Sequence, residues 1–112
     1  MAAAVVTLDE TAKIRRITWT LTNADPTGDA VSYTDFADRS VQATGTFGGS
    51  TITIEGSNDG TTYATLTDNQ NTAVTFTVPS IQSIEDLTLL IRPVLSGGAG
   101  STVVVTLLVR MP

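Results

Sequence analysis

Few side chains in this sequence have the chemistry that catalysis needs. The 112 residues include no cysteine and no histidine, and Lys13 is the single lysine. A serine nucleophile needs an imidazole or amine base beside it, and structural zinc sites need thiolates or imidazoles. The glutamates and aspartates stand mostly in turns, and no two of them are placed as the acid and base of a glycosidase. We therefore expect no enzyme activity, no metal ion and no cofactor.

One loop carries several oxygen ligands. Residues 23–30 read NADPTGDA, and Asn23, Asp25 and Asp29 are the side chains that could in principle hold calcium. Their spacing matches no defined calcium loop, and the Asp-Pro and Thr-Gly pairs are turn signals. The sequence favours a solvated turn here.

Charge narrows the class of partner. Six basic residues against eleven acidic ones give a net charge of −5, and the basic residues form no stripe. Proteins that bind nucleic acid usually present such a stripe to the phosphates. No apolar stretch reaches the ~20 residues that a membrane-spanning helix needs. We expect neither nucleic acid nor membrane as a partner.

The elements that position these residues read as β-strands. Threonine, valine and isoleucine supply 39 of the 112 residues, and such β-branched side chains favour strands. In residues 14–22, Ile17, Trp19 and Leu21 alternate with threonines, which predicts a strand with Trp19 in the core. Further strands are expected, with turns at residues 48–49 and 58–60, over residues 31–36, 41–47, 51–55, 63–67, 74–78, 87–95 and 102–111.

One segment departs from this pattern. In residues 79–86, Ser80 can cap a helical turn, and Ile81 and Ile84 are spaced to share its face. The chain is therefore predicted to be all-β, a single-domain antiparallel β-sandwich or jelly roll of about eight strands with one short helical turn. Residues 13–112 form the sandwich, and residues 1–12 form an N-terminal arm or edge strand. No internal repeat or linker divides it.

The last strand is apolar on both of its faces. Val103 and Val105 lie on one side, and Val104 and Leu108 lie on the other. A small monomeric sandwich is expected to show more polar outer positions. This pattern favours a homo-oligomer that buries the second face.

The segment 41–68 resembles a set of small β-rich virion proteins of tailed phages. The motifs GTFGG, EGSNDGT, RPV, GG and VTLL carry the resemblance over the C-terminal two-thirds of the chain, through Gly45–Gly49, Glu55–Thr61, Arg92–Val94, Gly97, Gly98 and Val105–Leu108. A weaker local likeness, to the discoidin-like jelly roll, rests on Ser57, Asp59, Gly60 and Tyr63. There the Asp-Gly turn and the aromatic residue are scaffold, so this likeness implies the fold rather than sugar binding.

The phage resemblance implies a head decoration (cement) protein that binds the outside of the capsid and stabilises it. Its partner is then the major capsid protein, with a homotrimer favoured and the virion, assembled in the host cytoplasm, as its location. The expected contacts are the apolar arm and one loop: Ala4, Val5, Val6, Leu8, Asp25, Pro26 and Thr27. The alternatives are a tail or baseplate component, and a carbohydrate-binding module for host attachment that stacks sugars on Tyr33, Tyr63 or Trp19.

Overall fold

Alternation of buried and exposed side chains builds the long strands. The structure is a computed structural model that describes residues 2–3, 5–8 and 13–111, with side chains from residue 13 onward. In β3 (Ile14–Thr22), Ile17, Trp19 and Leu21 are at most 1% exposed, while the threonines between them face outward. This period of two confirms the predicted strand and the core position of Trp19.

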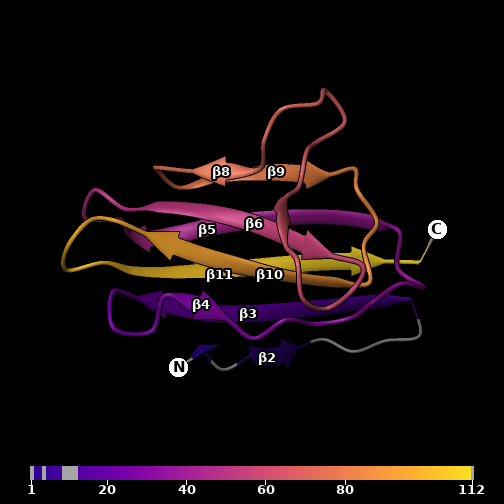
Figure 1. Cartoon of the computed structure of the whole chain (residues 1–112), viewed down its shortest axis with the longest axis horizontal. Coiled ribbons are helices and arrows are strands. Elements are labelled where there is room, and N and C mark those ends of the chain that lie inside the picture. The colour runs from indigo at the N-terminus through magenta and orange to yellow at the C-terminus, as the bar shows by residue number, and fades with distance from the viewer. Residues whose placement is uncertain (1, 4, 9–12, 112) are drawn as a thin grey trace.

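The strands form two sheets that pack face to face (Figure 1). Sheet A has the order β1 (Ala2–Ala3), β4 (Thr27–Gly28), β10 (Leu90–Ser96), β6 (Thr51–Ser57) and β7 (Ala64–Thr65), and β8 (Thr75–Phe76) also pairs with β6. Sheet B has the order β2 (Val5–Leu8), β3, β11 (Thr102–Arg110), β5 (Asp38–Thr46) and β9 (Ser80–Ile84). Neighbouring strands are antiparallel apart from the short parallel pair β1–β4. The chain is thus an all-β antiparallel sandwich, as predicted.

A single core fills the space between the sheets. Its largest fully buried side chains come from both sheets, and include Trp19, Ile17, Leu21, Ile52, Ile54, Ile91, Leu107 and Val41. On β11 every second residue from Val103 to Val109 is buried at 1% exposure or less. These burials are worth about 1.5–3 kcal/mol for each large side chain before the cost in chain entropy.

The predicted helical turn at residues 79–86 is wrong. The segment forms β9, which pairs with β5 from Ser80↔Ala43 to Ile84↔Arg39, and the described residues include no helix. Side chains three residues apart on a strand point to opposite faces of the sheet. Ile84 is therefore buried, while Ile81 is 63% exposed. The spacing of the two isoleucines is compatible with a helix or a strand, and backbone pairing with β5 makes the segment a strand.

Four other predicted strands are shorter than expected. The strands predicted over residues 63–67 and 74–78 are β7 and β8, of two residues each. In residues 31–36 only Val31 makes a bridge, to Ile91. The strand at residues 87–95 begins at Leu90, and Leu87 and Leu89 lie outside it with 48% and 45% exposure. None of the described residues belongs to a helix that could cross a membrane.

The N-terminal segment borders both sheets on one side of the sandwich. Ala2 and Ala3 pair with Thr27 and Gly28 in sheet A, and β2 pairs with β3 in sheet B from Val5↔Trp19 to Leu8↔Arg16. Figure 1 shows β1, β2, β3 and β4 together along that side. The backbone of this segment is therefore an edge strand for each sheet in turn.

Candidate partner-binding surface

The structure brings the two predicted contact segments together. Val5, Val6 and Leu8 belong to β2, and Thr27 in β4 pairs with Ala2 of the same N-terminal segment. Ala4 lies outside the described residues. The arm and the loop thus share one side of the sandwich, although no sequence pattern places them side by side. Main-chain pairing with β1 and β2 covers β4 and β3, and β1 and β2 are themselves the outermost strands of their sheets on this side.

The loop that carries Asp25 and Pro26 is held firmly. Asp25 and Thr22 exchange backbone hydrogen bonds of 3.1 and 3.3 Å, and the Leu95 N–H donates to the Pro26 carbonyl over 2.7 Å. Thr27 pairs with Val94 of β10. The Asp25 Oδ1 atom is buried and accepts no hydrogen bond from the described residues. A partner at this site would meet a preformed surface.

Asn23, one of the three residues considered above for calcium, is bonded to main-chain groups of another loop. Its Nδ2 donates to the carbonyls of Gly97 and Gly98 over 3.1 and 3.4 Å, and its Oδ1 accepts the Ser101 N–H over 2.8 Å. The side chain is therefore engaged at both ends. No group of three or more acidic side chains gathers anywhere in residues 13–111 to hold a metal ion.

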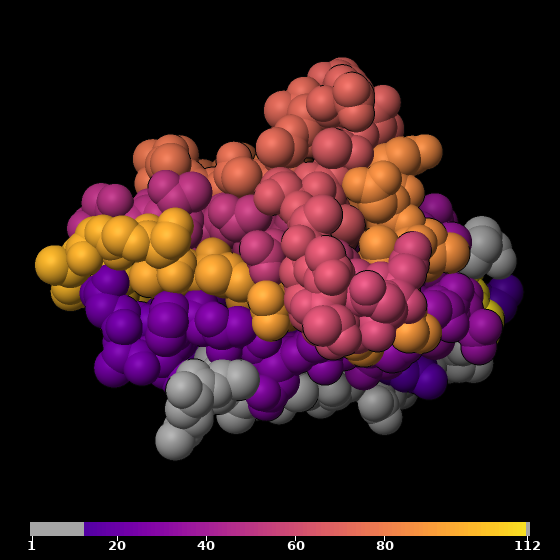
Figure 2. Space-filling view, in the orientation of Figure 1, coloured from indigo at the N-terminus to yellow at the C-terminus, as the bar shows by residue number. Residues whose placement is uncertain are grey.

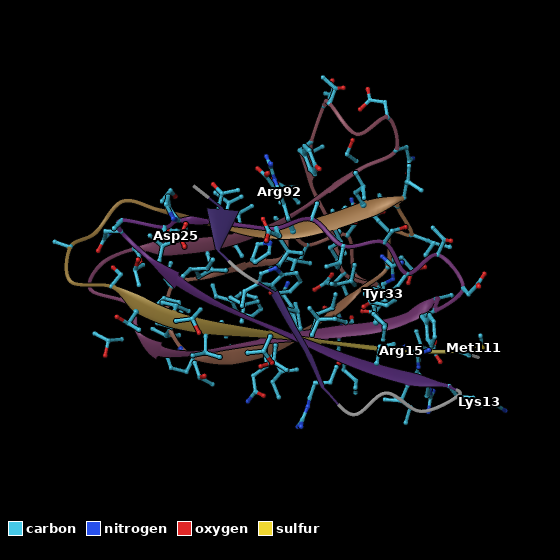
Figure 3. The ribbon with its side chains drawn as sticks, turned by 90° about the horizontal axis from the view of Figure 1, so that it is seen from below. Lys13, Arg15, Asp25, Tyr33, Arg92 and Met111 are labelled. Carbon is cyan, nitrogen blue, oxygen red and sulfur yellow. The ribbon has the colours of Figure 1, made fainter. Side chains whose placement is uncertain are left out.

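None of the three aromatic residues named for sugar stacking stands clear of its neighbours. Trp19 is 1% exposed, and its Nε1 donates to the Asp29 carbonyl over 2.9 Å. The Arg92 guanidinium lies 3.7 Å from the centroid of the Tyr63 ring and is also bonded to Glu55. Tyr33 packs edge-on against Phe36, with ring centroids 5.9 Å apart. Figure 3 shows Tyr33 and Arg92 on different parts of the molecule, so these side chains form no joint platform.

A hairpin of residues 66–74 projects from the molecule (Figures 1 and 2). The Asp68 Oδ1 accepts the backbone N–H groups of Thr72 and Gln70, and these bonds lower the pKa of Asp68. Gln82 donates to Asp68 Oδ2, and Asp86 Oδ2 accepts both the N–H and the hydroxyl of Thr67. The hairpin is thus braced against β9 and the segment that follows it, and it presents a fixed polar tip.

The second turn of the sequence motif is equally ordered. The Asp59 Oδ1 accepts the N–H groups of Thr62 and Thr61 and the Ser57 hydroxyl. Thr62 first, then Thr61 and Ser57, hold the pKa of Asp59 at about 2, because each donor favours the ionised carboxylate. Asp59 therefore shapes a turn.

One end of the sandwich contains a buried arginine. Arg39 is 6% exposed, and it donates from Nε to the Phe36 carbonyl over 3.0 Å and from Nη2 to the Tyr33 carbonyl over 2.8 Å. Burial lowers the pKa of Arg39 from its usual value. The guanidinium fixes the loop that closes this end, and sequence reasoning missed it because a single arginine in a strand gives no signal of burial.

The outer face of sheet B carries exposed apolar side chains. Ile14, Ile81 and Leu108 are 36%, 63% and 42% exposed, and they line one hollow of about 450 Å³ together with polar side chains of the same face. The apolar second face of the last strand pointed to Leu108. Ile81 was missed because its segment was read as helical.

Comparison with known proteins gives a fold and no family. No protein-family model matches the chain, and no curated protein matches it in sequence. Among solved structures, the crystal structure of the SPBc2 prophage-derived protein YomS is similar, with a TM-score of 0.62 and 13% sequence identity. The alignment covers 90% of this chain and 97% of that chain. The two proteins therefore share the sandwich over nearly their whole lengths.

Proposed function

We propose that this chain is a structural virion protein of a phage, of the type that decorates the outside of the head. The observation that carries the proposal is the fold shared, over 90% of this chain, with a protein described as prophage-derived. The tailed-phage motifs in residues 41–108 support the same assignment, and so does the lack of cysteine, histidine and paired carboxylates suited to catalysis. A non-enzymatic role follows from this proposal.

The proposed partner is the major capsid protein, with neither nucleic acid nor membrane involved. Asp25, Pro26 and Thr27 form one part of the proposed contact surface, beside the N-terminal edge strands. A preformed surface loses little conformational freedom on binding, which helps a small protein bind tightly. Many copies on one shell then add up to a large total stabilisation. A homotrimer is the oligomer that would fit three-fold positions of such a shell.

The test uses phage particles released from cells that carry the gene and banded by density. Quantitative mass spectrometry and gold-labelled antibody against the chain measure its copy number and position on the particle. We expect many copies, on the heads. Labelling confined to tails or baseplates would show a tail or baseplate component and overturn the head decoration role. Absence of the chain from the particles would overturn the proposal of a virion protein.

The contact surface is tested with purified protein added to heads from a strain in which the gene is deleted. Asp25→Lys is expected to lower head occupancy. Asp35→Lys is not, because it makes the same charge change at an exposed position two residues after Tyr33, which Figure 3 shows well away from Asp25. Thermal unfolding of both variants shows whether each is folded. Equal occupancy of the two folded variants would remove Asp25 from the contact surface.

A further inference from the structure

The outer face of sheet B has the features of an interface between protein subunits. Ile14 of β3, Leu108 of β11 and Ile81 of β9 reach the same hollow from three different strands. Single exposed apolar residues are common on monomers, but a patch that converges on one hollow marks an interaction site more often. The projecting hairpin lies on the sheet A side and leaves this face open (Figures 1 and 3).

The face is poor in charge. Its described outward positions are mostly uncharged, with Thr18, Thr20, Ser40, Gln42, Thr44 and Thr106 among them. Arg16 is the charged side chain that lines the hollow. Asp38 is the single carboxylate within β3, β5, β9 and β11, and Arg110 Nη2 pairs with it over 2.8 Å. Depletion of charge is typical of the centre of protein interfaces. These four strands hold one of the chain's eleven acidic residues, so two copies meet on this face with little repulsion between carboxylates, and the Arg16 side chains are the like charges that the contact must keep apart.

The size of the face suits a dimer. The five strands of sheet B contain 4, 9, 9, 9 and 5 residues, and at about 4.8 Å between strands and about 3.3 Å per residue they cover roughly 570 Å² per copy. Two such faces bury roughly 1,100 Å², which passes the area of about 1,000 Å² expected of a specific interface. Face-to-face packing of sheets is also the arrangement already used inside the sandwich.

We propose that the outer face of sheet B is the contact surface between two copies of this chain, related by a two-fold axis. In such a contact the same patch serves on both copies, so Leu108 and Ile81 of each copy become buried against the other. The contact closes at two copies. It therefore competes with the trimer expected from the phage resemblance, and it does not depend on the head-binding proposal.

The first test is solution mass by light scattering over a concentration series. We expect wild-type protein to reach twice the 11.7-kDa chain mass. Leu108→Asp is expected to raise the dissociation constant roughly 30-fold or more, as loss of a central interface contact does. The matched control is Leu87→Asp, because Leu87 is 48% exposed but lies off this face, before β10, and this variant should remain dimeric. Thermal unfolding confirms that both variants are folded.

A second test, by cysteine cross-linking, applies even if Leu108→Asp fails to fold. Because the chain has no cysteine, Thr106→Cys, at the centre of the face, gives an unambiguous cross-link. Mild oxidation should yield a covalent dimer of Thr106→Cys and little of Leu87→Cys. A wild-type monomer at the highest concentration, a trimer, equal effects of the two aspartate variants, or equal cross-linking of the two cysteine variants would overturn the proposal.

Discussion

Asn23 and Ser101 are joined across one end of the sandwich, with the Ser101 N–H 2.8 Å from the Asn23 Oδ1, although 78 residues separate them. The same asparagine donates to the Gly97 carbonyl, and the Ser101 hydroxyl donates to the Phe47 carbonyl over 2.6 Å. Three loops that follow different strands are therefore fixed to one another. Side-chain hydrogen bonds, not strand pairing, thus connect these loops.

Asn23→Ala should destabilise the protein by about 1–3 kcal/mol. The variant loses the bonds to Ser101 and Gly97 and leaves the Ser101 N–H, which is part-buried, without its partner. Asn69→Ala, in the exposed tip of the projecting hairpin, is the control and should change stability by less than about 0.5 kcal/mol. Urea denaturation of both variants gives the comparison. Equal stabilities would mean that the loops are held by other contacts.

Gly48 and Gly97 lie at the same end of the sandwich, and we expect substitution by alanine to have different effects at the two positions. Both have positive φ, +60° and +72°, but a Cβ on Gly48 would overlap the Ala99 carbonyl oxygen, whereas one on Gly97 meets no atom within 4 Å. Gly97→Ala should cost about 1–2 kcal/mol for the left-handed backbone alone. Gly48→Ala should cost more than about 3 kcal/mol, because backbone must also shift. A lower urea midpoint for Gly97→Ala than for Gly48→Ala would contradict the close approach of the loop at Gly48 to the loop at Ala99.

The sandwich was predictable because its signals are local. Alternation in β3 and β11 fixed which residues face the core, and the glycine and Asn-Asp-Gly turns fixed where hairpins turn. The error at residues 79–86 has a physical cause. Ile81 and Ile84 satisfy the spacing of a helix face, and only pairing with β5, distant in sequence, makes the segment a strand.

The surface was less predictable than the core. That the arm and the loop at Asp25 would lie together depends on β1 crossing to β4, a pairing between segments 25 residues apart that no local pattern encodes. The hollow on sheet B combines Ile14, Leu108 and Ile81 from three strands, so its existence depends on strand order. Chain periodicity revealed only that Leu108 faces away from the core.

Trp19 provides a spectroscopic test of the core. As the single tryptophan, at 1% exposure, it should emit at short wavelength in the native protein and shift to longer wavelength on unfolding. Trp19→Phe loses the bond from Nε1 to the Asp29 carbonyl and leaves a partial cavity, so it should cost about 2–4 kcal/mol. Emission typical of water-exposed indole in the folded protein would place Trp19 on the surface and make it a candidate for sugar stacking again.

Asp59 should make stability depend on acid pH. The donors from Thr62, Thr61 and Ser57 hold its pKa at about 2 in the folded chain, against its ordinary value of 3.8. A carboxylate with a depressed folded-state pKa stabilises the protein fully above its unfolded-state pKa, and this contribution is lost as the pH falls through the folded-state value. Wild-type protein should therefore lose stability between about pH 4 and pH 2 through this residue.

Asp59→Asn tests this dependence directly, because the amide cannot ionise. Its stability should lie below that of the wild type at neutral pH, and the gap should narrow steadily from about pH 4 and close near pH 2. Asp35→Asn removes one negative charge from an exposed loop and serves as the control for the effect of net charge. Carbon-13 NMR titration of the Asp59 carboxyl gives the folded-state pKa independently. A stability difference between wild type and Asp59→Asn that stays constant from pH 7 to pH 2 would contradict this prediction. It would mean that the charge of Asp59 does not strengthen the hydrogen bonds of the turn.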